Sequence, residues 1–384
     1  MRVLLISHTC QSRTEGQPKA RCLAKLPNID LKVLVPDRWN HYGKWRLADP
    51  VPADEFNCNI EHIMWPWIGP AQYYLHWYPK LSSVMRDFKP DVIDLWEEPW
   101  ALVSVQACFL REKLLPHCKI VSETEQNTNK RLPFPFERFR SYTLRHADYA
   151  VGRNSESIEI LRSKGYRGTA EVVPNAVDDT LFRPMDREAC RKRLNLAGFV
   201  AGYVGRLVEE KGLMDMVDAL PHCPPEINLL FVGGGDFAGS LAARAAKLNL
   251  THRVRIEGAR ALQDLPEIMN AIDVLVLPSR TTPSWKEQFG RVIIEAHACG
   301  TAVAGSSSGA IPEVVRDGGV VFPESNPEEL AMALCGLNAD SAATKKMGER
   351  GRIAVRECFT WQRVAERMEA IYSRVTADSI LEPT

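Results

Sequence analysis

Short apolar runs alternate with helix-compatible stretches along almost the whole chain. In the first half, strand-like runs lie at residues 3–7, 31–35, 92–95, 119–122 and 149–151. In the second half, they lie at residues 200–204, 228–232, 253–257, 274–277 and 301–304. Strands that alternate with helices are typical of parallel sheets covered by helices on both faces. We therefore predict an α/β protein.

The chain is long enough for two such sheets. Its 384 residues are about twice the usual size of one domain. Residues 173–184 (VPNAVDDTLFRP) separate the two series of strands and are rich in Pro, Asn and Asp, which is typical of a junction. We predict a first domain over residues 1–183 and a second over residues 184–360, each doubly wound and Rossmann-like.

The composition is that of an ordinary globular protein, with 45% apolar and 25% charged residues. Lys and Arg together number 48, as do Asp and Glu, so the net charge is zero and nothing favours nucleic acid as a partner. The apolar runs are strand-sized, far below the roughly 20 residues of a membrane span. The first residues lack the features of a signal peptide, so we expect a cytoplasmic protein.

The ten cysteines are scattered along the chain. No two are spaced C-x-x-C, and none joins a histidine cluster with the spacing of a zinc site. We expect small core residues of a reduced protein, with one reactive thiol as the alternative.

A glycine turn in the second half suggests one possible ligand. Gly233, Gly235 and Ala238 fit the G-x-G-x-x-G/A pattern of NAD sites, and Glu257 ends the next strand, where an acid would bind ribose. An NAD-dependent oxidoreductase is therefore one alternative. The position argues against it, because the fingerprint belongs in the first βα turn of a domain and this is the second. We prefer a glycine turn beside another ligand.

Two neighbouring segments indicate that other ligand. Arg206 and Lys211 follow Gly205 at the end of a strand, and two cations beside a glycine turn suit a diphosphate. A solvated charge pair is the alternative for that segment. Gly290 precedes a helix that is expected from residue 291 to about 299, and the N–H groups at a helix start bind phosphates.

Two carboxylates accompany this helix. Glu287 lies in the loop before it and Glu295 lies within it. Carboxylates placed on two elements around one pocket could accept hydrogen bonds from hydroxyl groups of a ribose and of a hexose. The alternative for Glu295 is an exposed helix carboxylate.

These motifs resemble those of the family 4 glycosyltransferases, which are retaining, nucleotide-sugar-dependent enzymes with the GT-B fold. The resemblance rests on the order and spacing of Gly205-Arg206-Leu207, Lys211-Gly212, Val232-Gly233, Asp273 to Ser279, and the pair Glu287 and Glu295. It is specific over about residues 200–329. In the first half only the pattern of elements is similar, and Ala176 replaces the usual glycine of the junction motif.

The resemblance implies a fold and a set of donor contacts. The two domains would face each other across a cleft, and a C-terminal helix within residues 361–384 would cross back onto the first domain. Arg206 and Lys211 would neutralise the donor diphosphate, which stabilises the leaving nucleotide. The remaining donor contacts would be Glu295 for the ribose, Glu287 for the sugar, the backbone of Phe289, Gly290 and Arg291, the loop of Arg260 for the base, the turn at Gly233, and the loop of Gly16.

One position departs from the family pattern. Members often carry a histidine at the end of the strand that corresponds to residues 119–122, close to the sugar, whereas this chain has Glu123. Glu123 is therefore a candidate catalytic residue, and Glu97 with Glu98 form another candidate acidic site. A carboxylate there could bind a sugar hydroxyl or steer the acceptor proton. The alternative is a catalytically silent subunit that binds a nucleotide sugar.

The acceptor side is indicated by two groups of residues. One is an aromatic cluster made of Trp65, Trp67, Tyr73, Tyr74, Trp77 and Tyr78. The other is a basic segment that contains Lys130, Arg131, Arg138, Arg140 and Arg145. Aromatic and basic side chains together suit anionic lipid headgroups or a lipid-diphosphate acceptor. A helix with a solvated basic face is the alternative for the basic segment.

We therefore expect a metal-independent hexosyltransferase that retains the configuration of the anomeric carbon. The donor is a nucleoside diphosphate sugar, with UDP favoured over GDP, and the acceptor is a saccharide, a lipid-linked sugar or a small molecule. The second half has no D-x-D motif at a strand end, and Arg206 and Lys211 can supply the charge that a metal would. We expect no cofactor, and peripheral contact with the inner face of the membrane.

Overall fold

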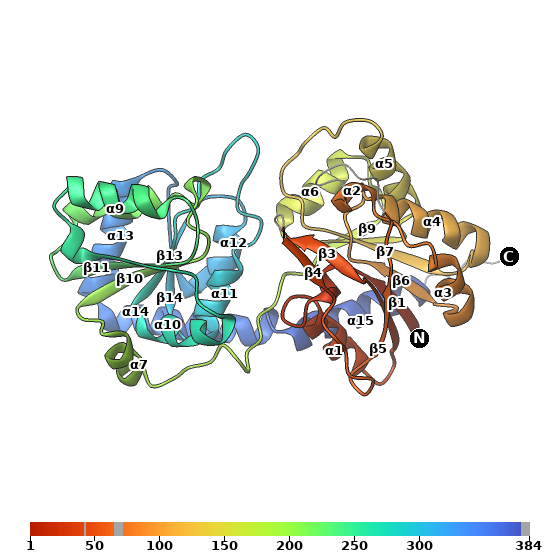
Figure 1. Ribbon diagram of the computed structural model, residues 1–384, viewed down its shortest axis with the longest axis horizontal. Helices are drawn as coiled ribbons and strands as arrows, with labels where there is room; N and C mark the ends of the chain where they lie inside the picture. Colours follow the sequence, from red (N-terminus) through yellow and green to blue (C-terminus); the bar gives the residue numbers. More distant parts are fainter. Residues whose placement is uncertain (42–43, 65–71, 378–384) are drawn as a thin grey trace. The chain divides into compact units, whose positions relative to one another are not determined.

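The structure is a computed structural model that describes residues 1–41, 44–64 and 72–377. The chain forms two compact units (Figure 1): the N-terminal unit comprises Met1–Pro174 and the segment that begins at Trp361, and the C-terminal unit comprises Asn175–Thr360. The sequence pattern puts the junction after residue 183, whereas the units divide after Pro174. Val177 N–H donates to the Phe359 carbonyl at 2.8 Å, and Phe182 is buried in the second core, so these residues belong to the C-terminal unit.

The N-terminal unit is built on a parallel sheet in the order β5-β2-β1-β6-β7-β8-β9. Its strands are β1 (Arg2–Ile6), β2 (Asp30–Pro36), β5 (Asn57–Glu61), β6 (Val92–Leu95), β7 (Lys119–Thr124), β8 (Tyr149–Gly152) and β9 (Thr169–Val172). The central strand β1 pairs with β2 and β6, so that Leu4 lies opposite Lys32 and Ile93. A short antiparallel hairpin, β3 (Arg38–His41) and β4 (Lys44–Leu47), follows β2.

Helices cover both faces of this sheet (Figure 1). They are α1 (Gln17–Ala24), α2 (Gln72–Leu75), α3 (Leu81–Phe88), α4 (Leu102–Leu114), α5 (Phe136–His146), α6 (Ser155–Ser163) and α15 (Trp361–Ala377), and the 3-10 helix η1 (Thr9–Gln11) precedes α1. The last helix, α15, packs against α1. It buries Val364, Met368, Ile371 and Val375, which recur at helical spacing on one face.

The C-terminal unit has a parallel sheet in the order β12-β11-β10-β13-β14-β15. Its strands are β10 (Phe199–Val204), β11 (Ile227–Val232), β12 (Val254–Glu257), β13 (Val274–Leu277), β14 (Ala302–Ser306) and β15 (Gly319–Phe322). Its helices are α7 (Arg187–Leu194), α8 (Leu213–Ala219), α9 (Ala238–Lys247), α10 (Leu265–Ala271), α11 (Arg291–Ala298), α12 (Ile311–Val315), α13 (Pro327–Ala339) and α14 (Ser341–Cys358). Figure 1 shows α9 and α13 on one side of the sheet and α10 and α14 on the other.

Both sheets reverse their strand order at the first strand. In the N-terminal unit β1 is flanked by β2 and β6, and in the C-terminal unit β10 is flanked by β11 and β13. This is the doubly wound arrangement, and ligands of such sheets bind beyond the carboxyl ends of the strands at the point of reversal. The predicted α/β class and the two Rossmann-like sheets are confirmed. The cleft between the domains stays a prediction.

The ten cysteines are all free thiols, and most are buried. Burial raises the pKa of Cys108 and of Cys118 to about 12, which keeps both thiols protonated and unreactive near neutral pH. Within the described part of the chain, no helix has the length and apolarity that crossing a membrane requires.

Candidate active site

The point of reversal in the C-terminal unit brings Lys211 and Glu287 together. Lys211 ends the 3-10 helix η3 (Glu209–Lys211) after β10, and Glu287 lies in the loop between β13 and α11. Lys211 Nζ donates to Glu287 Oε2 at 2.6 Å, and Ser279 Oγ donates to the same oxygen at 2.8 Å. The Lys211 ammonium also lies 4.7 Å from the ring centroid of Trp285. Two residues 76 positions apart in the sequence thus form one charged centre.

Arg206 lies in the same loop but is more exposed. Its side chain is 54% exposed, against 15% for Lys211, and its Nη2 lies 3.8 Å from Glu210 Oε1. The backbone of this residue is held in place, because Tyr203 Oη donates a hydrogen bond to the Arg206 carbonyl at 2.8 Å. The guanidinium can therefore turn toward a ligand while its backbone stays in place.

Helix α11 begins beside this centre. Gly290 caps it with φ +79°, a left-handed conformation that favours glycine, and the first N–H groups of a helix have no partner inside it. Phe289 is buried in the core, where its ring lies 6.0 Å from that of Phe359, so its backbone is the part left for a ligand. Arg291 is exposed at the first position of the helix.

Glu295 lies one turn further along α11 and is half-buried. Burial raises its pKa, and the charge of Arg291 opposes that shift. No side-chain hydrogen bond to its carboxylate occurs among the residues that the structure describes. A half-buried carboxylate without such a hydrogen bond is stabilised when a ligand donates hydrogen bonds to it.

The glycine turn after β11 packs against the Arg206 loop. A Cβ on Gly233 would lie 1.7 Å from the Gly205 carbonyl oxygen, and one on Gly235 would lie 2.1 Å from that of Leu207. Leu207 N–H also donates to the Gly234 carbonyl at 2.9 Å. The glycines are therefore needed for this close approach, which accounts for the motif without a dinucleotide.

Glu257, the proposed ribose acid of the NAD alternative, is already paired. Arg260 Nη2 donates to its Oε2 at 2.6 Å, and Arg255 contacts its other oxygen. These cations lower the pKa of Glu257 against the opposing effect of burial. Arg260 itself is exposed in the loop after β12, where the sequence analysis expects the nucleotide base.

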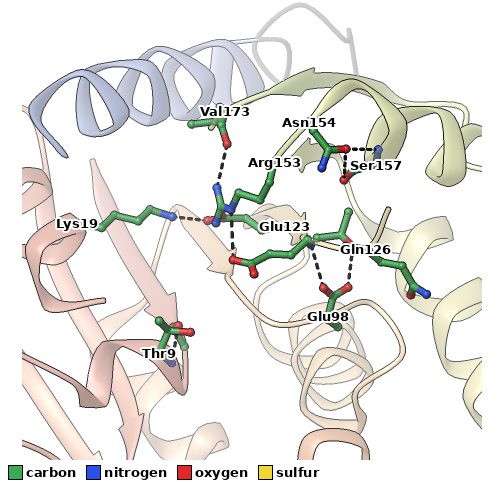
Figure 2. A network of polar contacts seen from close by, with 12 residues as sticks. Thr9, Lys19, Glu98, Glu123, Gln126, Arg153, Asn154, Ser157 and Val173 are labelled. Carbon is green, nitrogen blue, oxygen red and sulfur yellow. Dashed lines mark hydrogen bonds and ion pairs between the residues drawn. The ribbon is translucent and has the colours of Figure 1, made fainter. Parts of the chain in front are cut away.

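In the N-terminal unit, Glu123 has a different environment from the one expected. Lys19 contacts its Oε1 and Arg153 contacts its Oε2, as Figure 2 shows. Lys19 Nζ also donates to Asp94 Oδ2 at 3.1 Å, and Tyr372 Oη of α15 donates to that oxygen at 2.6 Å. We call these residues, Lys19, Asp94, Glu123, Arg153 and Tyr372, the buried ion network.

All members of the buried ion network are at most 3% exposed. Although burial alone would raise it, the pKa of Glu123 is lowered by Arg153 and Lys19. Burial and the charge of Glu123 raise the pKa of Asp94. Because both oxygens of Glu123 are occupied and covered, we correct its assignment from a sugar contact to a member of this network.

Close packing of the backbone explains why a glycine occupies position 16. It is buried at the start of α1, and a Cβ there would lie 2.4 Å from the Thr9 carbonyl carbon. The loop from β1 to α1 therefore folds back on η1, and Gly16 permits that approach.

The two candidate acids after β6 differ from each other. Glu98 accepts hydrogen bonds from Thr124 Oγ1 at 2.6 Å and from Glu125 N–H at 2.9 Å (Figure 2), and burial raises its pKa to about 7. Glu97 instead contacts His8, whose Nδ1 lies 2.7 Å from Glu97 Oε2 and whose backbone N–H donates to Oε1 at 2.6 Å. Sequence reasoning missed His8, although a histidine directly after the first strand of a doubly wound sheet is a detectable signal.

Only some of the residues predicted to form the acceptor surface are exposed. Trp65 and Trp67 lie outside the described residues, Tyr78 is buried in the core, and Tyr73 is 37% exposed. Arg140 is 3% exposed and contacts Glu137, so it faces the protein and not a membrane. A pocket of about 620 Å³ is lined by basic and aromatic side chains that include Arg138, Phe139, Tyr142, Arg145 and Lys164.

Comparison with known proteins identifies the family of the C-terminal unit. Residues 186–354 match the model of the family described as glycosyl transferases group 1. The C-terminal unit belongs to this family. All matched residues lie in the unit that holds Lys211, Glu287 and α11, and the resemblance inferred from the motifs is thereby confirmed.

Curated relatives of this group 1 glycosyltransferase unit include the D-inositol 3-phosphate glycosyltransferase of Segniliparus rotundus. It is 31% identical over 224 residues, which cover 56% of this chain and 49% of the relative. The GDP-mannose-dependent monoacylated alpha-(1-6)-phosphatidylinositol monomannoside mannosyltransferase of Corynebacterium glutamicum is 31% identical over 218 residues, which cover 54% and 57%. The chain spans about half the length of the curated relatives it matches.

Solved structures extend the likeness of fold to nearly the whole chain. HepE from Anabaena in complex with UDP has a TM-score of 0.76 at 21% identity, with 97% of this chain and 100% of that chain covered. Sucrose-phosphate synthase from Thermosynechococcus elongatus has a TM-score of 0.73 at 21% identity, with 98% and 100% covered. The predicted GT-B fold is shared with these solved structures.

Proposed function

We propose that the chain is a glycosyltransferase that moves a hexose from a nucleoside diphosphate sugar to an acceptor hydroxyl. The observation that carries this proposal is the pairing of Lys211 with Glu287 beside the start of α11. A fixed cation, the first N–H groups of α11 and a carboxylate meet at the ligand-binding edge of a sheet in the unit that matches the group 1 family.

Each group has a chemical task in this proposal. Arg206 and Lys211 bind the diphosphate and stabilise the charge that develops on it as the bond to the sugar breaks. Glu287 fixes Lys211 and offers its carboxylate to hydroxyl groups of the transferred sugar. Glu295 accepts hydrogen bonds from the ribose hydroxyls, which satisfies a half-buried carboxylate.

We favour UDP as the nucleotide, with retention at the anomeric carbon and no metal. HepE was solved with UDP and with UDP-glucose, which supports UDP, while the mannosyltransferase of C. glutamicum is named for GDP-mannose. Arg206 and Lys211 carry the positive charge that a divalent ion supplies to diphosphates elsewhere.

We further propose that the acceptor is a saccharide, in free or lipid-linked form, presented at the inner face of a membrane. The pocket lined by Arg138, Arg145 and Lys164 supports a lipid-linked acceptor, since it combines three cations with aromatic walls. Peripheral binding would bring the N-terminal unit to the membrane surface. A small-molecule acceptor is the alternative.

A thermal-shift screen tests the donor assignment. A ligand that binds the native state raises Tm, so UDP or GDP and their sugars should raise it while NAD should not. A rise with NAD alone would overturn the assignment and restore the oxidoreductase alternative. Release of UDP or GDP from the stabilising sugar nucleotide then separates an enzyme from a silent binding subunit.

A further inference from the structure

Two cysteines of the C-terminal unit are neighbours in space, although they are far apart in the sequence. Cys223 follows the 3-10 helix η4 (Leu220–His222), and Cys335 lies on α13, which packs against η4. Cys223 Sγ lies 4.0 Å from the carbonyl oxygen of Ala331, one helical turn before Cys335. Cys335 Sγ lies 3.9 Å from the carbonyl oxygen of His222, the residue before Cys223. Each sulfur therefore contacts the segment that carries the other sulfur.

The two segments are also tied together by polar contacts. The buried guanidinium of Arg253 donates to the carbonyl oxygens of Cys223 at 3.4 Å and of Pro224 at 2.7 Å. Asn338 Nδ2 of α13 donates to Glu226 Oε1 at 3.2 Å, which joins the helix to the segment that follows Cys223. Two cysteines can be bridged without backbone movement only when the segments that carry them already lie close together. These contacts keep the two segments in that position.

The two thiols differ in their access to solvent. Cys223 is 8% exposed, whereas Cys335 is half-buried. Burial raises the pKa of Cys223 to about 12, and the neighbouring Cys335 thiol adds to this shift. A small oxidant dissolved in water therefore reaches Cys335 first, and Cys223 lies beside it as a second thiol.

We propose that Cys223 and Cys335 are a redox-responsive pair that hydrogen peroxide converts to a disulfide. The Cys335 sulfur attacks one peroxide oxygen, the O–O bond breaks, and Cys335 becomes a sulfenic acid while one water leaves. The Cys223 sulfur then attacks the Cys335 sulfur, and the S–O bond breaks. The departing hydroxide takes the Cys223 proton and leaves as a second water. The two sulfurs together lose two electrons, and the peroxide gains them.

This disulfide would join α13 to the segment before β11. Because Cys223 precedes β11 in a parallel sheet, the pair lies at the amino ends of the strands. Lys211 and Glu287 lie beyond the opposite, carboxyl ends, so the inference does not depend on the proposed function. A cross-link between positions so distant in the chain restricts the unfolded state, and the oxidised protein should therefore be more stable to heat.

Peptide mapping tests the cross-link directly. Trypsin cleaves after Lys211 and Arg244 on either side of the first cysteine, and after Arg316 and Lys345 on either side of the second, so each peptide contains one cysteine. The full chain is treated with hydrogen peroxide, its remaining thiols are alkylated, and it is digested without reductant. Mass spectrometry should then find the two peptides joined, with a mass two hydrogens below their sum. Dithiothreitol should separate them.

Thermal unfolding of the intact chain gives a second readout. The oxidised wild type should have a Tm about 4 °C or more above that of the reduced protein, and dithiothreitol should reverse the rise. Cys335→Ser and Cys223→Ala should show neither the joined peptides nor the rise. Cys358→Ser is the matched control, because Cys358 is half-buried on α14 of the same unit, and it should show both.

The wild-type peptide map decides the proposal whether or not the variant at the buried position folds. A disulfide from Cys335 to a different cysteine would overturn the pairing. Conversion of Cys335 to a sulfinic acid without any cross-link would overturn it as well. A rise in Tm that persists in Cys335→Ser would show that the stabilisation has another origin.

Discussion

The sheets of the two units both reverse their strand order at the first strand, but the charged side chains near that point are exposed in one unit and buried in the other. At the edge of the C-terminal unit, Lys211 and Arg206 keep 15% and 54% of their side chains exposed. In the N-terminal unit, Lys19 and Arg153 are 1% and 2% exposed at the side chain and contact buried carboxylates. The exposed cations of the C-terminal unit can bind a charged ligand. The buried cations of the N-terminal unit are already paired with carboxylates of the protein itself.

This difference explains why one half of the chain could be interpreted from motifs. A diphosphate requires cations, a glycine turn and a helix start at fixed spacing, so the C-terminal unit carries a local pattern. The buried ion network joins β6, β7, α1 and α15, with Tyr372 lying 278 residues from Asp94. Contacts assembled from such distant positions leave no local pattern in the sequence.

The largest expected effect is on the buried ion network. Glu123→Gln leaves Lys19 with Asp94 and leaves Arg153 with only the more exposed Glu125, and breaking a buried pair costs about 3–5 kcal/mol. The free energy of unfolding of the variant should fall by that amount in urea titrations. Glu125→Gln is the matched control, since this carboxylate is 42% exposed and lies 3.6 Å from Arg153.

The control should lose no more than about 1 kcal/mol, as expected for an exposed ion pair. A Glu123→Gln protein of wild-type stability that has lost sugar transfer would reverse the comparison, because it would make Glu123 a group at the substrate.

The second effect concerns the cations of the C-terminal unit. Arg206→Ala and Lys211→Ala should each slow turnover about 10²-fold, which corresponds to about 3 kcal/mol of transition-state stabilisation. Steady-state kinetics with the donor found in the thermal-shift screen measure this. Arg244→Ala is the control, because Arg244 pairs with Asp218 on the neighbouring helices α9 and α8. Wild-type turnover in both loop variants would show that the diphosphate binds elsewhere.

The fold was largely predictable, because buried parallel strands are continuous apolar runs. The strands at 92–95 and 274–277 agree with β6 and β13 to the residue. The strands β9 and β15 were missed, since their residues are only partly buried and carry a weaker apolar signal. The junction was placed too late because the Pro and Asp residues of 174–184 mark a loop and not the point where packing changes.

The site was predictable where its parts are close in sequence. Glu287, Gly290 and Glu295 could be placed from one segment, and the loop of Lys211 from another. The contact between Lys211 and Glu287 required the three-dimensional structure, as did the pair of His8 and Glu97, whose members are 89 residues apart. Burial could not be inferred for Glu123 or Arg140, because charged residues are rarely buried unless they are paired.

A third test divides the roles of the two carboxylates of the C-terminal unit. Glu295→Gln should weaken binding of bare UDP about tenfold, since its proposed contact is the ribose. Glu287→Gln should reduce turnover more than it reduces UDP affinity. Isothermal calorimetry and kinetics on both variants measure the two quantities. An equal loss of nucleotide affinity in both would contradict the division.

The same carboxylate gives a pH dependence of known sign. Burial raises the pKa of Glu295, so its ionised form is lost as the pH falls through that raised value. UDP affinity of the wild type should therefore decrease in weakly acidic buffer, and Glu295→Gln should lack this component. Calorimetric titrations over a pH series measure the difference between the two proteins.

The smallest effect tests whether exposed charge in the N-terminal unit has a ligand. Arg140 is buried, so the residues to change are Arg138 and Arg145, which are exposed on α5. Each basic residue near an anionic membrane contributes about 1 kcal/mol, so Arg138→Gln or Arg145→Gln should weaken binding to phosphatidylglycerol vesicles about fivefold at low salt. Arg86→Gln on α3 is the exposed control. If the control loses as much, or if the wild type ignores such vesicles, then the basic pocket serves no membrane and the C-terminal unit alone presents its charges to a ligand.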